Sequence, residues 1–187
     1  MEFYLHYRGP LKANGNPTHK QEIRRHFHQQ LKELWSQKPL ASYQAWLTAK
    51  PDHPDALWFL RLMGVFTFVT LVTEHANLIA ELSITLLRPE APGSIITQSG
   101  DIDNRLKTLF DALRKPHTLA ELPPGDEPGV GEDKFFCLLE DDNLISHVTI
   151  KTDRLLEQVT DQSEVLLLIA VKTRVTRATW GNMGLGV

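Results

Sequence analysis

Residues 77–88 read NLIAELSITLLR, and this stretch decides the fold class. Its apolar side chains alternate with polar neighbours, and a period of two is typical of a β-strand with one buried face. After Pro89 and Pro92 the spacing changes, because apolar residues in 103–115 (DNRLKTLFDALRK) recur at intervals of three and four. That interval is typical of an amphipathic helix. A strand followed by such a helix favours a fold that mixes both kinds of element.

The segments on either side extend this mixture. Thr18 and Gln21 have the spacing of a capping box, which predicts the start of an amphipathic helix. The predicted helices are residues 19–37, 40–49 and 103–115, and the predicted strands are residues 3–7, 57–73, 77–88, 135–139, 144–151 and 164–176. This order predicts an α+β fold in which two main helices pack on one face of a mixed β-sheet. Residues 57–73 and 77–88 are expected to form a hairpin.

Composition and charge narrow the class. The chain has 187 residues, 42% of them hydrophobic and 23% charged, which predicts a single globular domain over residues 1–187. Residues 116–133 are rich in proline, glycine and acidic side chains, and we expect them to form a mobile inserted loop. The formal net charge is −3, so contact with phosphates must come from a local patch or through bound cations.

The cysteine content and the apolar segments predict the cellular compartment of the protein. The single cysteine, Cys137, excludes a disulfide framework and a four-cysteine zinc site, and it fits a reducing, cytoplasmic compartment. The N-terminus carries Glu2 and lacks the apolar run of a signal peptide. Residues 56–73 are apolar enough to mimic a membrane span, but Arg61 and Gly64 interrupt them. We therefore expect core strand there, and no contact with a membrane.

Paired acidic residues are the most informative chemical feature. Asp101 and Asp103 stand two apart directly before the second main helix, and in an extended segment their carboxylates point the same way. Such a pair suits Mg²⁺ or Mn²⁺, which prefer oxygen ligands. Lys107 lies one helical turn after Asp103, where a cation can hold a phosphate or stabilise a leaving oxygen. Asp141 and Asp142 follow another predicted strand, and only the fold can bring Asp142 to the same place.

Ordinary structural roles also explain each of these acidic groups taken alone. An aspartate before a helix is a common N-cap, and one in the first turn favours the helix dipole. The sequence Asp141-Asp142-Asn143 is common turn composition.

Taken together, the acidic groups form a longer pattern. It reads D-x-D-N-x-x-K-x-x-x-D-A-L, followed after a gap by D-D-x-x-[VI], and it resembles the RusA-type Holliday-junction resolvases, which are small endodeoxyribonucleases of bacteria and phages. The matching residues are Asp101, Asp103, Asn104, Lys107, Asp111, Ala112, Leu113, Asp141, Asp142 and Ile145. The resemblance covers residues 77–151 and, more loosely, the first helix.

The resemblance implies a RusA-like fold and a specific activity. Such enzymes are homodimers in which each subunit binds Mg²⁺, with Mn²⁺ as a possible substitute, and hydrolyses phosphodiester bonds of branched DNA during recombination and repair. By position, the implied catalytic residues are Asp101, Asp103, Lys107 and Asp142, the implied metal ligands are Asp101, Asp103 and Asp142, and the accessory residues are Asp141 and Asn104.

DNA contact is the weaker part of this hypothesis. A basic face of the first helix is usually a solvated face, but in a nuclease it becomes a backbone contact. The residues that we expect to serve in this way are Arg24, Arg25, Lys32 and Arg105. Residues 97–100 (TQSG) bring no basic side chain to the first motif, and the isoelectric point is about 6.2. These features leave a second hypothesis open, a RusA-like DNA-binding or assembly protein with weak or absent cleavage.

Overall fold

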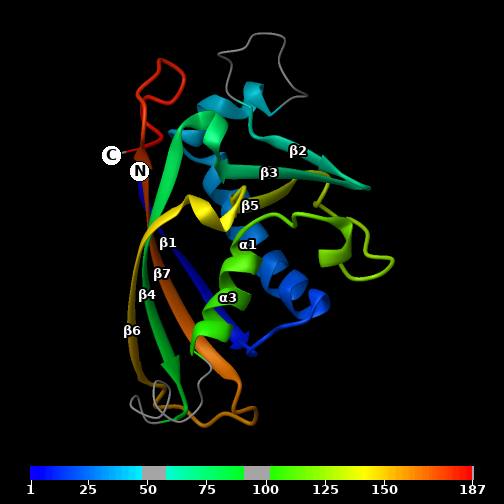
Figure 1. Cartoon of the computed structure of the whole chain (residues 1–187), viewed down its shortest axis with the longest axis vertical. Helices are drawn as coiled ribbons and strands as arrows, with labels where there is room; N and C mark the ends of the chain where they lie inside the picture. The colour runs from blue at the N-terminus through cyan, green and yellow to red at the C-terminus, as the bar shows by residue number, and fades with distance from the viewer. Residues whose placement is uncertain (48–57, 91–101, 187) are drawn as a thin grey trace.

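The computed structural model describes residues 1–47, 58–90 and 102–186. Within these ranges the chain forms two β-sheets, two α-helices and short 3-10 turns (Figure 1). The strands are β1 (Glu2–Pro10), β2 (Leu60–Met63), β3 (Phe66–Val72), β4 (Leu78–Arg88), β5 (Phe135–Leu139), β6 (Ile145–Arg154) and β7 (Glu164–Val175). The helices are α1 (Pro17–Ser36) and α3 (Ile102–Leu113), and the 3-10 turns are η1 (Leu40–Trp46), η2 (Glu74–Ala76), η3 (Leu119–Glu121) and η4 (Asp142–Leu144). The predicted α+β class is confirmed, with two sheets in place of one.

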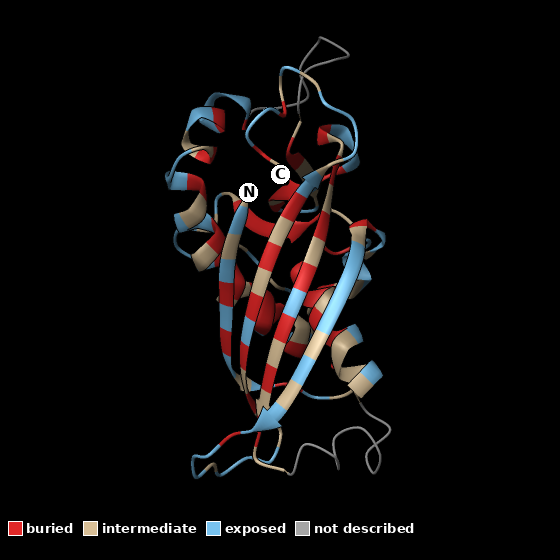
Figure 2. Cartoon of the chain, turned by 90° about the vertical axis from the view of Figure 1, so that its left-hand side faces the viewer, coloured by how far each residue is buried: buried red, intermediate tan, exposed pale blue. Residues whose placement is uncertain are grey.

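The larger sheet is built around β4, which comes from residues 77–88, the stretch that decides the fold class. Its strand order is β1-β7-β4-β6, with β4 antiparallel to β7 and parallel to β6. Ile84 of β4 pairs with Ile169 of β7, and both are buried, whereas the next residue, Ser83, is exposed on the other face. Figure 2 shows this alternation along the strands, with the helices behind the sheet. One face of the sheet is therefore core and the other is solvated.

The smaller sheet has the order β2-β3-β5. Its strands β2 and β3 join at Gly64, whose φ of +56° is one that residues with a side chain rarely adopt. The predicted hairpin between residues 57–73 and 77–88 is wrong, because β3 pairs with β2 and β5 whereas β4 lies in the larger sheet. Nearly every residue of β3 is buried, so this strand needs cover on both faces, which the edge of a half-solvated sheet does not provide.

The apolar stretch that could mimic a membrane span is strand where the structure describes it, since it supplies β2 and β3. In the described parts of the chain, we find no helix with both the length and the apolar character required to cross a bilayer.

Helix α1 begins earlier than its predicted start. Asn16 is the N-cap, and its side-chain oxygen accepts the N–H of His19 at 2.9 Å. Pro17 occupies the first helical position, where its missing N–H costs nothing because that group has no intrahelical partner. The predicted capping box is therefore wrong, since Thr18 lies inside the helix rather than at its cap.

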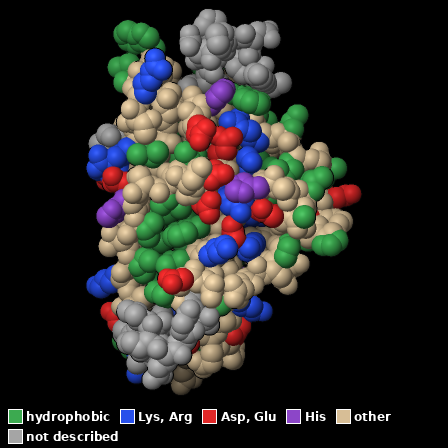
Figure 3. Space-filling model, viewed as in Figure 1, with side chains coloured by type: hydrophobic (Ala, Val, Ile, Leu, Met, Phe, Trp, Pro, Cys, Tyr) green, Lys and Arg blue, Asp and Glu red, His purple; other side chains and the backbone are tan. Residues whose placement is uncertain are grey.

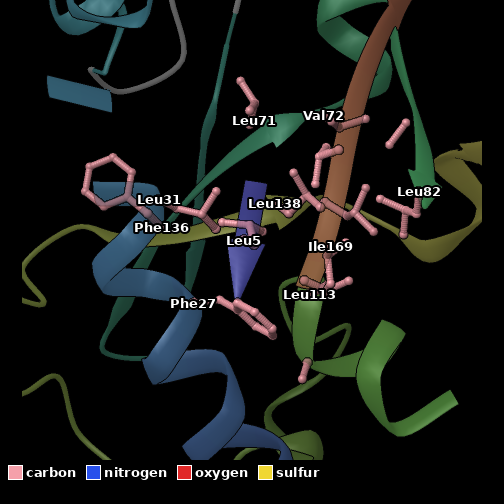
Figure 4. Close-up of a cluster of buried hydrophobic side chains, with 14 of the residues drawn as sticks. Leu5, Phe27, Leu31, Leu71, Val72, Leu82, Leu113, Phe136, Leu138 and Ile169 are labelled. Atoms are coloured by element: carbon pink, nitrogen blue, oxygen red, sulfur yellow. The ribbon is translucent and has the colours of Figure 1, made fainter. Parts of the chain in front are cut away.

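The core lies between α1, α3 and the two sheets. Phe27 and Leu31 of α1 are buried together with Phe136 of the smaller sheet and Leu5 and Ile169 of the larger one (Figure 4). Both helices cover the same face of the larger sheet, as predicted (Figures 1 and 2). Burial of each such side chain contributes about 1.5–3 kcal/mol, so this cluster fixes how the helices sit on the sheets.

The basic face of α1 is partly covered, because residues 116–133 pack on it. Arg25 donates from Nε to Glu132 at 3.0 Å, and Lys32 donates from Nζ to the carbonyl of Gly131 at 2.6 Å. The loop is thus anchored to the helix, because its acidic side chains find cationic partners there, and its mobility remains a prediction.

His28 lies on the same covered face of α1. It is buried, and its Nδ1 accepts the backbone N–H of Phe136 at 2.9 Å. A nitrogen that accepts a hydrogen bond carries no proton, so this ring is neutral. Burial lowers the pKa of His28 below its ordinary value, although Glu132 opposes this effect.

We expect acid to weaken this contact. The pKa of His28 in the folded state is lower than in the unfolded chain, where it is about 6.5. The stabilisation that neutral His28 provides is therefore fully present above about pH 6.5, the unfolded-state pKa, and it is lost as the pH falls through the folded-state pKa of His28. Urea unfolding at pH 7.5 and pH 5.0 should show a larger loss for the wild type than for His28→Gln, by about 1 kcal/mol, the scale of one hydrogen bond. Equal losses in both proteins would contradict this role, since the buried His19 and the half-buried His26 are present in both.

Candidate metal centre

Helix α3 carries part of the predicted site. Leu109 and Leu113 face the core, which leaves Asp103 and Lys107 exposed and one turn apart on the outer side. Neither side chain forms a hydrogen bond or ion pair with another described residue. Within the described part of the chain, no other side chain therefore competes with a ligand for either group.

The other predicted metal residues have different placements. Asp101 lies outside the described residues, so its role stays a prediction. The main-chain oxygen of Asn104 accepts the hydroxyl of Thr108 at 3.1 Å. Its side chain is partly exposed on the first turns of α3.

The turn after β5 holds Asp141 and Asp142. Asp141 is the N-cap of η4, and its Oδ1 accepts the N–H of Asn143 at 2.9 Å. Asp141 therefore does stabilise the turn, as its sequence context alone suggests. The strands on either side do not pair with one another, because β5 belongs to the smaller sheet and β6 to the larger. This turn therefore crosses from one sheet to the other.

A histidine that sequence analysis missed completes the group. His117 Nε2 lies 2.9 Å from Asp141 Oδ2, and one ligand atom from each of His117, Asp141 and Asp142 lies within 4.8 Å of the other two. Figure 3 shows Asp and Glu side chains gathered beside histidine on the face that carries α3. Nothing in the spacing of His117, which falls inside a proline-rich loop, points to these carboxylates.

Backbone pairing brings the two segments together. Arg114 forms a parallel bridge with Leu139, and the N–H of Lys115 donates to the carbonyl of Leu139 at 3.0 Å. Glu121 Oε2 then accepts the N–H of His117 at 3.3 Å and Nη1 of Arg114 at 2.8 Å. The His117 backbone is thus held beside the turn by contacts that do not involve its ring.

The protonation state of Asp141 suits cation binding. Partial burial alone would raise its pKa, but the Asn143 N–H and the nearby His117 outweigh burial and lower it. The carboxylate is therefore ionised at neutral pH and able to act as a ligand.

The separation of the three ligand atoms fits one small divalent ion. Two ligands at about 2.0–2.2 Å from an ion are at most about 4.4 Å apart, and about 3 Å apart when they lie at right angles. The 2.9 Å between His117 Nε2 and Asp141 Oδ2 matches two ligands at right angles. The ligand atoms of the whole group lie within 4.8 Å of one another, which is slightly more than the limit of about 4.4 Å. A small rotation of one side chain closes this difference. The residues present can hold such an ion.

Asp103 is separate from this group. It lies in the first turn of α3, whereas Arg114, just beyond the last turn, pairs with Leu139 near the Asp141–Asp142 turn. Ten residues of helix span about 15 Å. Among the described residues, Asp103 joins no set of three ligands, so the predicted grouping of Asp101, Asp103 and Asp142 remains a prediction.

Asp111 of the sequence motif has a structural role. It is only 5% exposed, and its two oxygens accept from Lys20 Nζ at 2.7 Å and Arg114 Nη2 at 2.6 Å. These ion pairs join α1, α3 and the segment that leads to His117.

The DNA-contact prediction fails for Arg24 and is weakened for the other three residues. Arg24 is 1% exposed, so it cannot reach a phosphate without unfolding. Arg25 and Lys32 hold the loop over α1, and Arg105 donates to the carbonyl of Leu11. The sequence pattern identifies these basic side chains, but it does not show that their hydrogen-bond and ion-pair partners lie within the chain.

Comparisons with known proteins add no family. The chain matches no family model, and searches of curated proteins and of solved structures find no similar protein.

Proposed function

We propose that this protein is a divalent-cation-dependent endodeoxyribonuclease that acts on branched DNA, including Holliday junctions, as a homodimer. The observation that carries the proposal is the convergence of His117, Asp141 and Asp142 from separate segments. The motif pattern in α3 and the turn after β5 supports it, because Asp103 and Lys107 are exposed on the helix that η4 contacts.

The residues divide the chemistry between them. A divalent cation at the His117–Asp142 group would supply Lewis-acid stabilisation of negative charge on a phosphodiester. Lys107 carries an exposed ammonium group that can bind a neighbouring phosphate or stabilise the leaving oxygen. Asp103 is exposed on the same face of α3 as Lys107 but stands apart from the His117–Asp142 group, so its catalytic role rests on the motif pattern alone.

A second function is favoured by the charge arrangement. All four predicted DNA contacts are engaged with protein groups at their charged ends, and Asp103 stands apart from the three-residue group. These observations favour a DNA-binding or assembly protein that cuts weakly or not at all. The two functions differ in whether a divalent cation supports cleavage of DNA.

Cleavage of a four-way junction tests the first function. With Mg²⁺ or Mn²⁺, Asp142→Asn should lower the cleavage rate by about 100-fold or more, because loss of one ligand charge weakens both cation binding and charge stabilisation. Asp133→Asn is the matched control, since Asp133 is exposed and outside the group. Wild-type cleavage by Asp142→Asn would reject the site. A gel shift without cleavage by the wild type would favour the second function.

A further inference from the structure

The chemical nature of the third ligand distinguishes this site from an all-oxygen one. Mg²⁺ and Ca²⁺ take oxygen ligands, whereas an imidazole nitrogen suits first-row transition metals. His117 presents Nε2, rather than a carbon edge of the ring, toward the Asp141 carboxylate at 2.9 Å. One nitrogen and two carboxylates, on partly exposed residues, leave the remaining positions of an ion open to water or substrate.

We propose that His117 makes this centre selective for a first-row transition-metal dication over Mg²⁺, and Mn²⁺ serves as the probe because it is paramagnetic. The inference takes from the proposed function only that the site binds a cation. The Glu121 contact to the His117 backbone supports it, because the ring is held beside the carboxylates without using its own nitrogens for the purpose. The competing explanation is a partly exposed hydrogen-bonded contact between His117 and Asp141 that binds no metal.

Direct binding of Mn²⁺ to the full-length protein, without DNA, tests the inference. The amplitude of the free Mn²⁺ signal in electron paramagnetic resonance measures the bound fraction, and titration with Mg²⁺ measures its competition. We expect His117→Ala to weaken Mn²⁺ binding by about 10-fold or more while Mg²⁺ binding changes little. His147→Ala is the matched control, because His147 is also exposed but lies on β6 outside the group.

The outcomes separate this inference from the nuclease proposal. Equal Mn²⁺ affinity in wild type and His117→Ala, or no Mn²⁺ binding by the wild type, overturns the inference. Asp141→Asn gives a second check, since it must also weaken Mn²⁺ binding if the imidazole and this carboxylate share an ion. His117-dependent Mn²⁺ binding without DNA cleavage upholds the inference and rejects the nuclease. Junction cleavage with unchanged metal preference in His117→Ala upholds the nuclease alone.

Discussion

Asp111→Ala should destabilise the protein by about 3–5 kcal/mol, because it leaves two cations without their buried partner. The carboxylate lies between Lys20 and Arg114, and both ion pairs are shorter than 3 Å. The loss should appear as a lower midpoint in urea unfolding followed by circular dichroism.

The pH dependence of the same variant gives an independent check. Burial alone would raise the pKa of Asp111, but Lys20 and Arg114 outweigh it and lower the pKa. The stabilisation by Asp111 is therefore fully present above the unfolded-state pKa of about 3.9. It is lost as the pH falls through the lower pKa that Asp111 has in the folded state. Asp103→Ala on the same helix is the control, and its exposed carboxylate should change stability by about 1 kcal/mol or less. Equal effects of the two substitutions would show that the buried pairs carry no net stability.

Local periodicity predicts most of the fold. Strand β5 has its predicted bounds, and β4, β7 and α3 differ from prediction by one or two residues, because one face of each is buried. Alternation identifies a strand but not its partner, so two sheets were predicted as one. Pairing depends on which faces need cover, and the nearly fully buried β3 pairs with β2 and β5 rather than with β4, the next strand along the chain.

The candidate site is predicted less completely, for a related reason. Asp141 and Asp142 are identifiable because turn composition follows an apolar strand. His117 is not, since its approach depends on the backbone pairing of Arg114 and Lys115 with Leu139. No side-chain pattern encodes that contact, which forms only after α3 and β5 pack.

Arg24 shows how a charged residue can mislead a prediction from periodicity. Its position on α1 suggests a basic outer face, but its guanidinium donates to the carbonyls of Asp111 at 2.7 Å and Arg114 at 2.9 Å, and also to Gln21. These carbonyls lie at the C-terminal end of α3, where a helix leaves acceptors unsatisfied and the dipole favours a cation. Arg24 therefore ties the end of α3 to α1.

We expect Arg24→Met to lower the free energy of unfolding by about 2–5 kcal/mol, since two buried carbonyls lose their donor. Arg24→Lys should also be destabilised, because one ammonium group cannot reproduce the fork of a guanidinium. Lys32→Met is the matched control on the same helix, and its exposed contact predicts a loss of about 1 kcal/mol or less.

The lysine variant decides between a structural and a DNA-binding role for Arg24. A phosphate contact tolerates lysine, so in that role Arg24→Lys would keep both wild-type stability and wild-type affinity for a four-way junction. The buried contacts predict the opposite, a lower urea midpoint for Arg24→Lys and normal junction affinity for whatever fraction remains folded. Arg24→Met with wild-type stability but weakened DNA binding would return Arg24 to the nucleic-acid interface.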